Sequence, residues 1–153
     1  MPPPSSDASL PVTSRNGTSL NGNRAGPAFS FAVPVGPEAA VAARRATVGA
    51  GFELPTAVSD DVLLLITELV TNAVRHAGAG PGANVAVALR RHEGDLRVEV
   101  TDAGPRFATM PERPGHEGVG GWGLFLVDRI ADRWGVEPAE PGTRVWFEVR
   151  AEV

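Results

Sequence analysis

The stretch ELVTNAVRHAG places a carboxylate and a carboxamide four residues apart, at Glu68 and Asn72. In an α-helix, residues three, four and seven apart share one face, so these two side chains would align with Asp61. A narrow polar stripe in a mostly apolar helix indicates a partly covered site. The pattern also fits an ordinary solvated face. Arg75 and His76, which follow the pair, fit structural hydrogen bonds better than catalysis.

A second candidate is VEVTDAGP, in which Asp102 ends an apolar, strand-like run and Gly104 follows two residues later. A carboxylate fixed at the end of a strand can accept a hydrogen bond from an amino group, such as the exocyclic amine of adenine. Asp and Gly are also ordinary turn residues, so this motif alone is weak.

The third candidate is GVGGWGL, where Gly121 and Gly123 flank the start of an apolar, helix-like run. Glycines let the backbone approach an anion closely, and the first turn of a helix offers free N–H groups with positive dipole character. The pattern therefore indicates phosphate binding by backbone amides. A flexible linker or a glycine-rich helix cap is the alternative.

Composition limits the chemistry further. The 153-residue chain contains no cysteine, and all fourteen of its basic residues are arginine. The absence of lysine excludes a G-x-x-x-x-G-K-[ST] phosphate loop and a kinase that depends on a strand lysine, and the absence of cysteine excludes thiolate zinc sites. Backbone amides together with a metal ion are then the natural way to hold phosphates.

Charge and hydropathy indicate where the protein works. A net charge of -4 argues against a domain that grips nucleic acid, although one site can be locally positive. No window approaches the roughly 20 apolar residues of a membrane span, and the N-terminus lacks the pattern of a secretory signal. We therefore expect a cytoplasmic protein that binds neither nucleic acid nor membrane.

The elements that position these residues follow from periodicity and turn signals. Residues 1–27 are rich in Pro, Ser, Asn and Gly and predict a disordered tail, which leaves 28–153 as the folded domain. FSFAVPV predicts a strand, at the edge of a sheet because of Pro34. An alanine-rich helix is expected over 37–51. A second helix starts near Thr56 or Ser59 and ends near Gly78.

The second half of the chain has the pattern of strands around one helix. We predict a hairpin over 84–102, a loop over 103–121, a helix over 122–134 and a final strand pair over 135–140 and 143–153. This order predicts an α+β fold, a two-layer α/β sandwich in which three helices cover one face of a mixed, mostly antiparallel sheet.

Taken together, these stretches resemble the motifs of the GHKL ATPase/kinase superfamily, which includes histidine-kinase catalytic domains and anti-sigma-factor serine kinases. ELVTNAVRHA is similar to the N-box, TDAGP to the first glycine box, GWGLFLV to the second, and GTRVWFEV to the last Gly-Thr motif. The resemblance covers residues from about 29 to 150 and is specific because four motifs occur in order. It implies the GHKL ATP-binding fold.

By this resemblance the ligands are ATP and Mg²⁺. Glu68 would take a proton from a serine hydroxyl or from water, and Asn72 would coordinate the metal. Asp102 would accept a hydrogen bond from the adenine amine, with Thr143 assisting, and residues 106–120 would form a lid. The implied nucleotide-binding positions are Asn72, Asp102, Gly104, Gly121, Gly123, Leu124 and Thr143.

Two departures from the superfamily pattern concern the phosphate contacts. Gly121, Gly123 and Leu124 match G-x-G-L and would supply backbone N–H groups, but Trp122 occupies the variable position, where small polar or basic residues are often met. The first glycine box continues as Gly-Pro-Arg and lacks a second glycine, which would stiffen the start of the loop.

The segments RHAG, DRWGV and VWFEV most resemble the small, stand-alone anti-sigma-factor serine kinases. This branch implies a protein kinase that phosphorylates a small antagonist (anti-anti-sigma) protein, controls a sigma factor and pairs with itself as a homodimer. One alternative is a non-catalytic regulator that binds a partner according to its nucleotide state. Another is a small α/β domain that binds no nucleotide.

Overall fold

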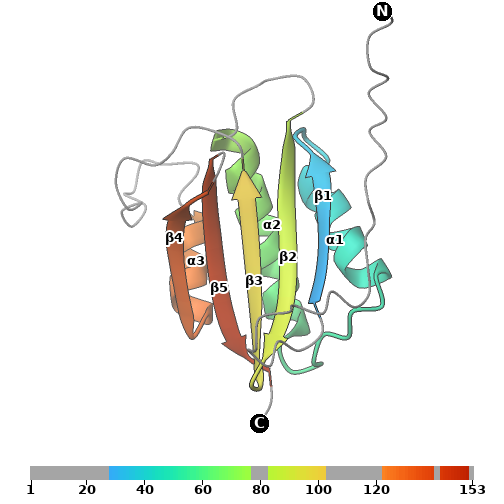
Figure 1. The fold of residues 1–153 in the computed structure, drawn as a ribbon, viewed down its shortest axis with the longest axis vertical. Coiled ribbons are helices and arrows are strands. Elements are labelled where there is room, and N and C mark those ends of the chain that lie inside the picture. The colour runs from blue at the N-terminus through green and yellow to red at the C-terminus, as the bar shows by residue number, and fades with distance from the viewer. Residues whose placement is uncertain (1–27, 77–82, 103–121, 140–141, 152–153) are drawn as a thin grey trace, which may run out of the picture.

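The computed structural model describes residues 28–76, 83–102, 122–139 and 142–151 (Figure 1). They form five strands and three helices. In chain order these are β1 (Ala28–Pro34), α1 (Ala39–Gly49), α2 (Ser59–His76), β2 (Asn84–His92), β3 (Asp95–Asp102), α3 (Trp122–Ile130), β4 (Arg133–Pro138) and β5 (Thr143–Arg150). The predicted tail over 1–27 and the predicted loop over 103–121 lie outside the described residues.

The five strands form one sheet in the order β1-β2-β3-β5-β4. Every pairing in this sheet is antiparallel, so the predicted mixed, mostly antiparallel sheet is fully antiparallel within the described residues. β1 lies at an edge, as its Pro34 predicts. The β2–β3 hairpin turns through Glu93 and Gly94, whose φ angles of 49° and 88° suit the tight turn of a two-residue hairpin.

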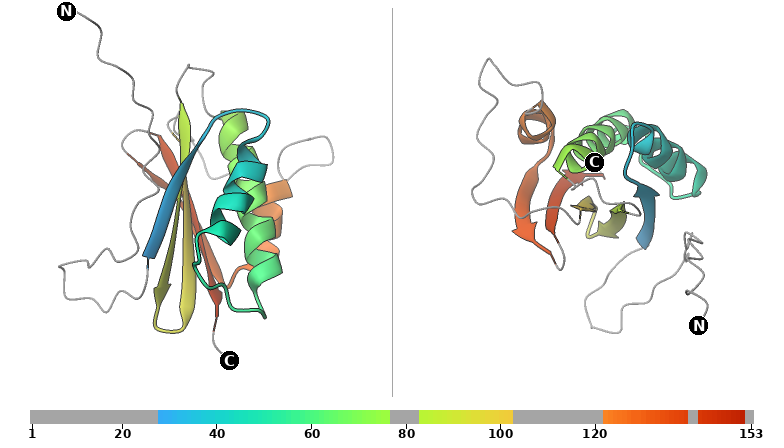
Figure 2. Two further views of the ribbon diagram at one scale, coloured as in Figure 1. Left: turned by 90° about the vertical axis from the view of Figure 1, so that its right-hand side faces the viewer. Right: turned by 90° about the horizontal axis from the view of Figure 1, so that it is seen from above.

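The three helices cover one face of the sheet and leave the other face open (Figure 2). On β3 the side chains alternate strictly, with every second residue buried under the helices. On α2 the face predicted to be apolar is buried, and α1 approaches the core through the small residues Ala39 and Ala43. The α+β two-layer architecture predicted from the sequence is therefore confirmed.

The largest fully buried side chains come from both layers and form one core. They are Val62, Leu65, Ile66, Leu69, Val70, Val85, Val87, Leu89, Leu96, Val98, Val127 and Phe147. Helix α2 supplies five of these and packs against β2, β3, α1 and α3. The helix that carries Glu68 and Asn72 is thus anchored on three sides.

The third helix is shorter than predicted. It ends at Ile130, and Arg133 and Trp134, predicted as its last residues, are the first two residues of β4. The Asp132 amide donates to the Glu148 carbonyl (2.9 Å), and the Asp132 carboxylate accepts from the Arg150 amide (2.7 Å). These bonds to β5 pull the chain into the sheet, so pairing across the sheet overrides the local helical pattern.

The other helices and strands begin or end within a few residues of the predicted positions. Helix α1 and strand β5 end earlier than the sequence pattern suggests, at Gly49 and Arg150. None of the described helices combines the length and the apolar character needed to cross a membrane.

Candidate functional site

Four element ends meet on one side of the molecule. In Figure 1 the C-terminal end of α2, the end of β3, the start of β5 and the start of α3 all face the upper end. Asp102 and Thr143 are directly paired across β3 and β5, and α2 packs against both β3 and α3. The fold therefore brings together stretches that the sequence separates by up to about 75 residues.

Asp102 and Thr143 form the buried part of this region. Both lie on the helix side of the sheet, with 5% and 2% of their surfaces exposed. The Thr143 Oγ1 atom has no hydrogen-bond partner within the described residues. A buried hydroxyl without a partner costs about 1–3 kcal/mol, so such a group indicates a place for a ligand or an ordered water.

Glu68 and Asn72 lie one turn apart on the half-buried flank of α2. Within the described part of the chain, neither side chain has a hydrogen-bond or ion-pair partner. The hydroxyls of Thr67 and Thr71, on the same stretch of helix, donate instead to the carbonyls of Leu63 and Thr67, both at 2.8 Å. Glu68 and Asn72 thus keep their polar atoms available for a ligand.

The start of α3 supplies the third component. The helix begins at Trp122, so Gly123 and Leu124 stand in its first turn, where backbone N–H groups have no partner within the helix. Val127 is fully buried and Leu124 packs against the core, which fixes the direction of the helix. These amides and the positive end of the helix dipole suit an anion.

Other predicted positions stand apart from this group. Asp61 is exposed in the first turn of α2, about 16 Å along the helix from Asn72. It shares the predicted stripe but lies at the opposite end of the helix. Arg75 is exposed near the site end of α2, and His76 is the last residue of that helix. Gly104, Gly121 and the predicted lid over 106–120 lie outside the described residues.

The comparison with protein families decides what this arrangement is. The family model for the histidine kinase-like ATPase domain matches residues 33–149, which is most of the chain. This range includes the end of α2, the end of β3, the start of α3 and the start of β5. The chain belongs to the histidine kinase-like ATPase family. The superfamily resemblance is therefore confirmed, and ATP binding follows for this ATPase domain.

Two similar proteins complete the comparison. An uncharacterised protein of Streptomyces coelicolor is 43% identical over 75 residues, which is 47% of this chain and 69% of that protein. The histidine kinase domain from the blue-light activated histidine kinase of Erythrobacter litoralis EL346 is 26% identical, with a TM-score of 0.44 over 59% of this chain. The match covers 43% of that structure, so this ATPase domain spans less than half of its length.

The described residues fit ATP. A buried carboxylate beside an unpartnered buried hydroxyl suits a base with both donor and acceptor groups, as adenine has. The first turn of α3 suits phosphates, because its free amides bind oxygen anions without lysine. The two parts of this arrangement come from different elements, since Asp102 and Thr143 are paired across β3 and β5 and the free amides belong to α3.

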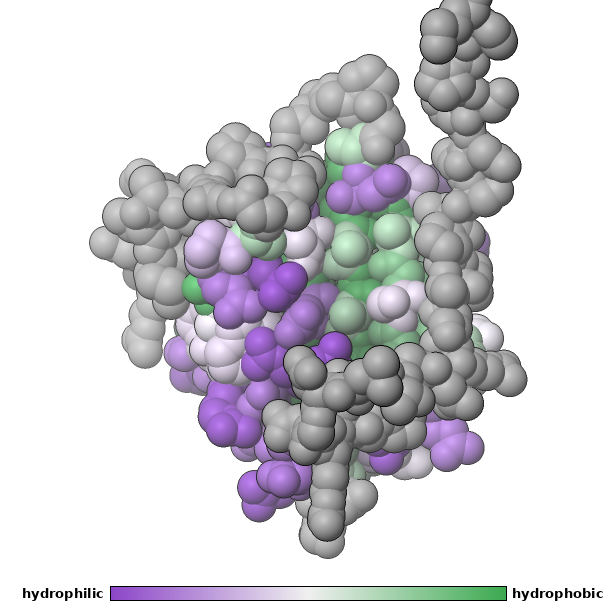
Figure 3. Space-filling view, in the orientation of Figure 1, coloured by the Kyte–Doolittle hydropathy of each residue, from purple (hydrophilic) through white to green (hydrophobic). Residues whose placement is uncertain are grey.

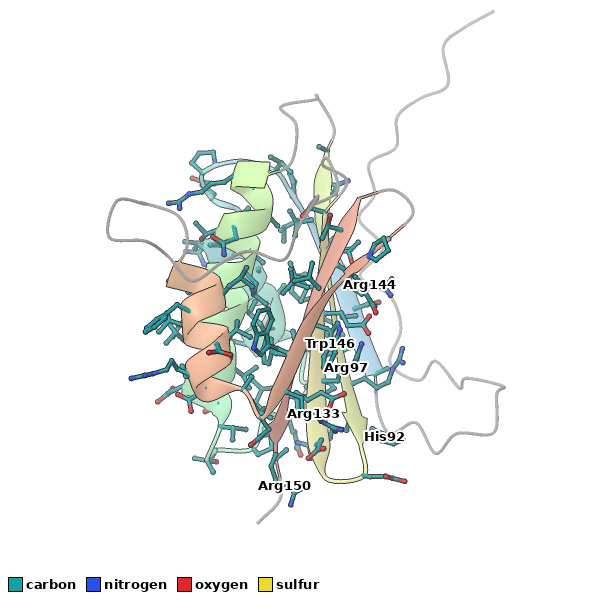
Figure 4. The ribbon with its side chains drawn as sticks, turned by 90° about the vertical axis from the view of Figure 1, so that its left-hand side faces the viewer. His92, Arg97, Arg133, Arg144, Trp146 and Arg150 are labelled. Atoms are coloured by element: carbon teal, nitrogen blue, oxygen red, sulfur yellow. The ribbon has the colours of Figure 1, made fainter. Side chains whose placement is uncertain are left out.

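A second polar group, not predicted from the sequence, lies on the opposite face of the same strands. Arg97 donates to Glu99 (2.9 Å) and to Glu148 (3.1 Å), and its guanidinium lies 4.1 Å from the ring centre of Trp146. Figure 4 shows Arg97 and Trp146 on the side of the sheet away from the helices. Burial lowers the pKa of Arg97, but the bonds to both carboxylates outweigh it, and the pKa is raised.

This group continues across β4 and β5 as a network of ion pairs. Arg133 pairs with Glu148 (2.6 Å) and Asp95 (3.3 Å), and Arg144 pairs with Glu137 (3.1 Å). In Figure 3 the hydrophilic residues gather over this part of the open face. In the sequence, the signal for this network was the charged residues at alternate positions of these strands. Because its charges are paired with one another, the network contributes to the stability of the sheet.

Proposed function

We propose that this ATPase domain is an ATP-dependent protein-serine kinase of the anti-sigma-factor type. It phosphorylates a small antagonist protein and thereby controls a sigma factor by partner switching. The observation that supports this proposal best is Glu68, a half-buried carboxylate without a partner in the described part of the chain. It lies one turn before Asn72, in the middle of the helix whose C-terminal end is on the same side of the molecule as the buried Asp102–Thr143 pair. A regulator that only binds nucleotide has no need of a proton acceptor there.

In the proposed reaction Glu68 accepts the proton of the incoming serine hydroxyl. The serine oxygen forms a bond to the γ-phosphorus of ATP, the bond from that phosphorus to the bridging oxygen breaks, and ADP leaves. Asp102 accepts from the adenine amine, with Thr143 beside it, and the amides of Gly123 and Leu124 hold phosphate oxygens. Gly104 and Gly121 would add backbone contacts to the same ligand.

Mg²⁺ belongs to this proposal because phosphoryl transfer concentrates charge on the phosphates. No group of three or more His, Cys, Asp or Glu side chains within the described residues could hold a metal alone. Phosphate oxygens, water and the Asn72 carboxamide would therefore hold it together, which is the usual arrangement for this ion. When bound, Mg²⁺ neutralises charge on the transferring phosphoryl group.

Radioactive ATP with Mg²⁺ and small candidate antagonist proteins tests the kinase directly. We expect phosphoserine on one antagonist, and a loss of about 100-fold or more in the rate for Glu68→Gln, because general-base catalysis contributes that much. ATP affinity should stay near the wild-type value in this variant. The matched control is Asp61→Asn, which removes a carboxylate from the same helix far from Asn72 and should leave the rate unchanged.

A second candidate is the non-catalytic regulator that binds its partner according to nucleotide state. It is favoured by Trp122, which opens α3 at the variable position of the glycine motif. The same assay separates the two functions. Tight ATP binding without phosphate transfer to any antagonist supports the regulator, and transfer that persists at the full rate in Glu68→Gln contradicts the proposed role of Glu68.

A further inference from the structure

Helix α1 presents a face that nothing within the described residues covers. Val41 is 51% exposed and Val48 is 63% exposed. Among the large hydrophobic side chains of the described residues, these two are the most exposed. Arg44 and Arg45 lie between them and are also exposed. At helical spacing these four residues form one continuous face, opposite the buried Ala43.

The charges of this face are not balanced locally. Neither Arg44 nor Arg45 has a hydrogen bond or ion pair within the part of the chain that the structure describes, and α1 contains no acidic residue. Three arginines of the open sheet face differ from this pair, since Arg97, Arg133 and Arg144 are each paired with carboxylates. The two adjacent arginines therefore leave two uncompensated positive charges on this face of a chain whose net charge is -4.

We propose that the exposed face of α1, formed by Val41, Arg44, Arg45 and Val48, docks an acidic and partly apolar surface of a protein partner. The two valines, seven residues apart, suit apolar side chains, and the arginines between them suit carboxylates. The positive charge of the two arginines favours a partner surface that is acidic. Two arginines on an acidic protein are too few for a nucleic acid or an anionic membrane, which need a wider basic surface.

The position of α1 suits a regulatory contact. It packs along α2, which carries Glu68, and α2 itself exposes Leu64 (39%) one turn before that residue. A partner bound on α1 would therefore lie beside the helix that bears the proposed proton acceptor. The docking proposal does not require phosphate transfer, because it depends only on the exposed apolar and charged side chains of α1.

A labelled helical peptide that mimics such an acidic and apolar surface tests this face of α1. The peptide carries leucines seven residues apart with two glutamates between them, and its binding is followed by fluorescence anisotropy. We expect binding to the wild-type protein and an affinity at least about tenfold lower for the double variant Arg44→Glu/Arg45→Glu, because two ion pairs become repulsive. A peptide with lysines in place of the glutamates should show the reverse preference.

The control is Arg90→Glu, which reverses an exposed arginine on the open sheet face and should leave peptide affinity unchanged. Stabilisation by ATP in the double variant checks that it is folded and keeps this test separate from the proposed kinase. Three results would overturn the docking proposal. They are no binding of the acidic peptide to wild type, equal binding to the double variant, and stronger binding to phosphatidylserine vesicles or duplex DNA than to the peptide.

Discussion

Strands β3 and β5 carry polar side chains on both faces of the sheet, and the two faces treat them differently. On the open face Arg97 has two carboxylate partners and an indole against its guanidinium. On the helix side Asp102 and Thr143 are almost completely buried, and the Thr143 hydroxyl has no partner within the described residues. The two regions therefore differ at one atom, because the Thr143 hydroxyl is buried without a partner and the charged groups of the open face are paired.

This difference distinguishes polar groups that stabilise the fold from polar groups that can bind a ligand. A polar group that the protein pairs internally adds modest stability and leaves nothing for a ligand to bind. A buried group left without a partner lowers stability in the free protein, and a ligand that pairs with it recovers that loss. Mutations on the open face should therefore change stability and leave ATP affinity unchanged, whereas mutations on the helix side should change ATP affinity.

Among substitutions on the two faces of the sheet, the largest effect is expected for Asp102→Asn. The substitution keeps the shape of the side chain but removes the charge that accepts from adenine, which lowers ATP affinity by about ten- to a hundredfold. Isothermal titration calorimetry measures this change. Glu99→Gln is the matched control because Glu99 lies on the same strand and faces the open side, and its ATP affinity should equal that of wild type. Unchanged affinity in Asp102→Asn would remove Asp102 from the site.

Gly135→Ala should reduce stability without changing ATP affinity. A Cβ atom at residue 135 would lie 2.9 Å from three indole atoms of Trp146, and Arg97 on the indole hinders its retreat. Overpacking of this kind costs about 1–3 kcal/mol of unfolding free energy, measurable by denaturant titration. Gly36→Ala, where a Cβ atom meets nothing within 4 Å, is the control. Equal stabilities of the two variants would show that Trp146 is not held in place.

Thr143→Val should move stability and affinity in opposite directions. Valine has nearly the same shape but no hydroxyl, so the free protein should gain about 1 kcal/mol in unfolding free energy while its ATP affinity falls. Thermal unfolding with and without ATP measures both. A loss of stability in the free protein would mean that the hydroxyl is already satisfied, and the contrast between the two faces would weaken.

The smallest effect is expected for Glu148→Gln on the open face. Glu148 joins Arg97 and Arg133, but exposed ion pairs contribute only about 0.2–1 kcal/mol each, and Arg133 is 67% exposed. The loss of unfolding free energy should shrink in about 1 M NaCl, where the screening length falls to a few ångströms. A loss that salt leaves unchanged would assign Glu148 a packing role.

Most of the fold was predictable from the sequence because its signals are local. The alternation of β3, the Glu93–Gly94 turn and the apolar face of α2 each follow from residues within a few positions of one another. The end of α3 was not predictable in this way. Trp134 continues the helical pattern, and only the bonds between Asp132 and β5 place it in a strand.

The sequence predicted the separate motifs of the site but not how these motifs lie relative to one another. Sequence spacing placed Glu68 and Asn72 on one helix face, but it also placed Asp61 there, and the structure shows that Asp61 lies in the first turn of α2, away from the helix end that faces Asp102 and Thr143. The direct pairing of Asp102 with Thr143 depends on the insertion of β5 between β3 and β4. No local pattern encodes that insertion, because the two residues are far apart in the sequence.

The central claim is that the end of the molecule with Asp102 and Thr143 binds ATP. Its most direct test is thermal unfolding of the wild-type protein and of Asp102→Asn over a titration of ATP with Mg²⁺. At about 100 times the wild-type dissociation constant, ATP should stabilise the wild type by about 2.7 kcal/mol, while the variant, with its ten- to hundredfold lower affinity, should gain only about 0.4–1.4 kcal/mol at the same concentration. An unchanged melting temperature in the wild type, or equal stabilisation of both proteins, would contradict the claim.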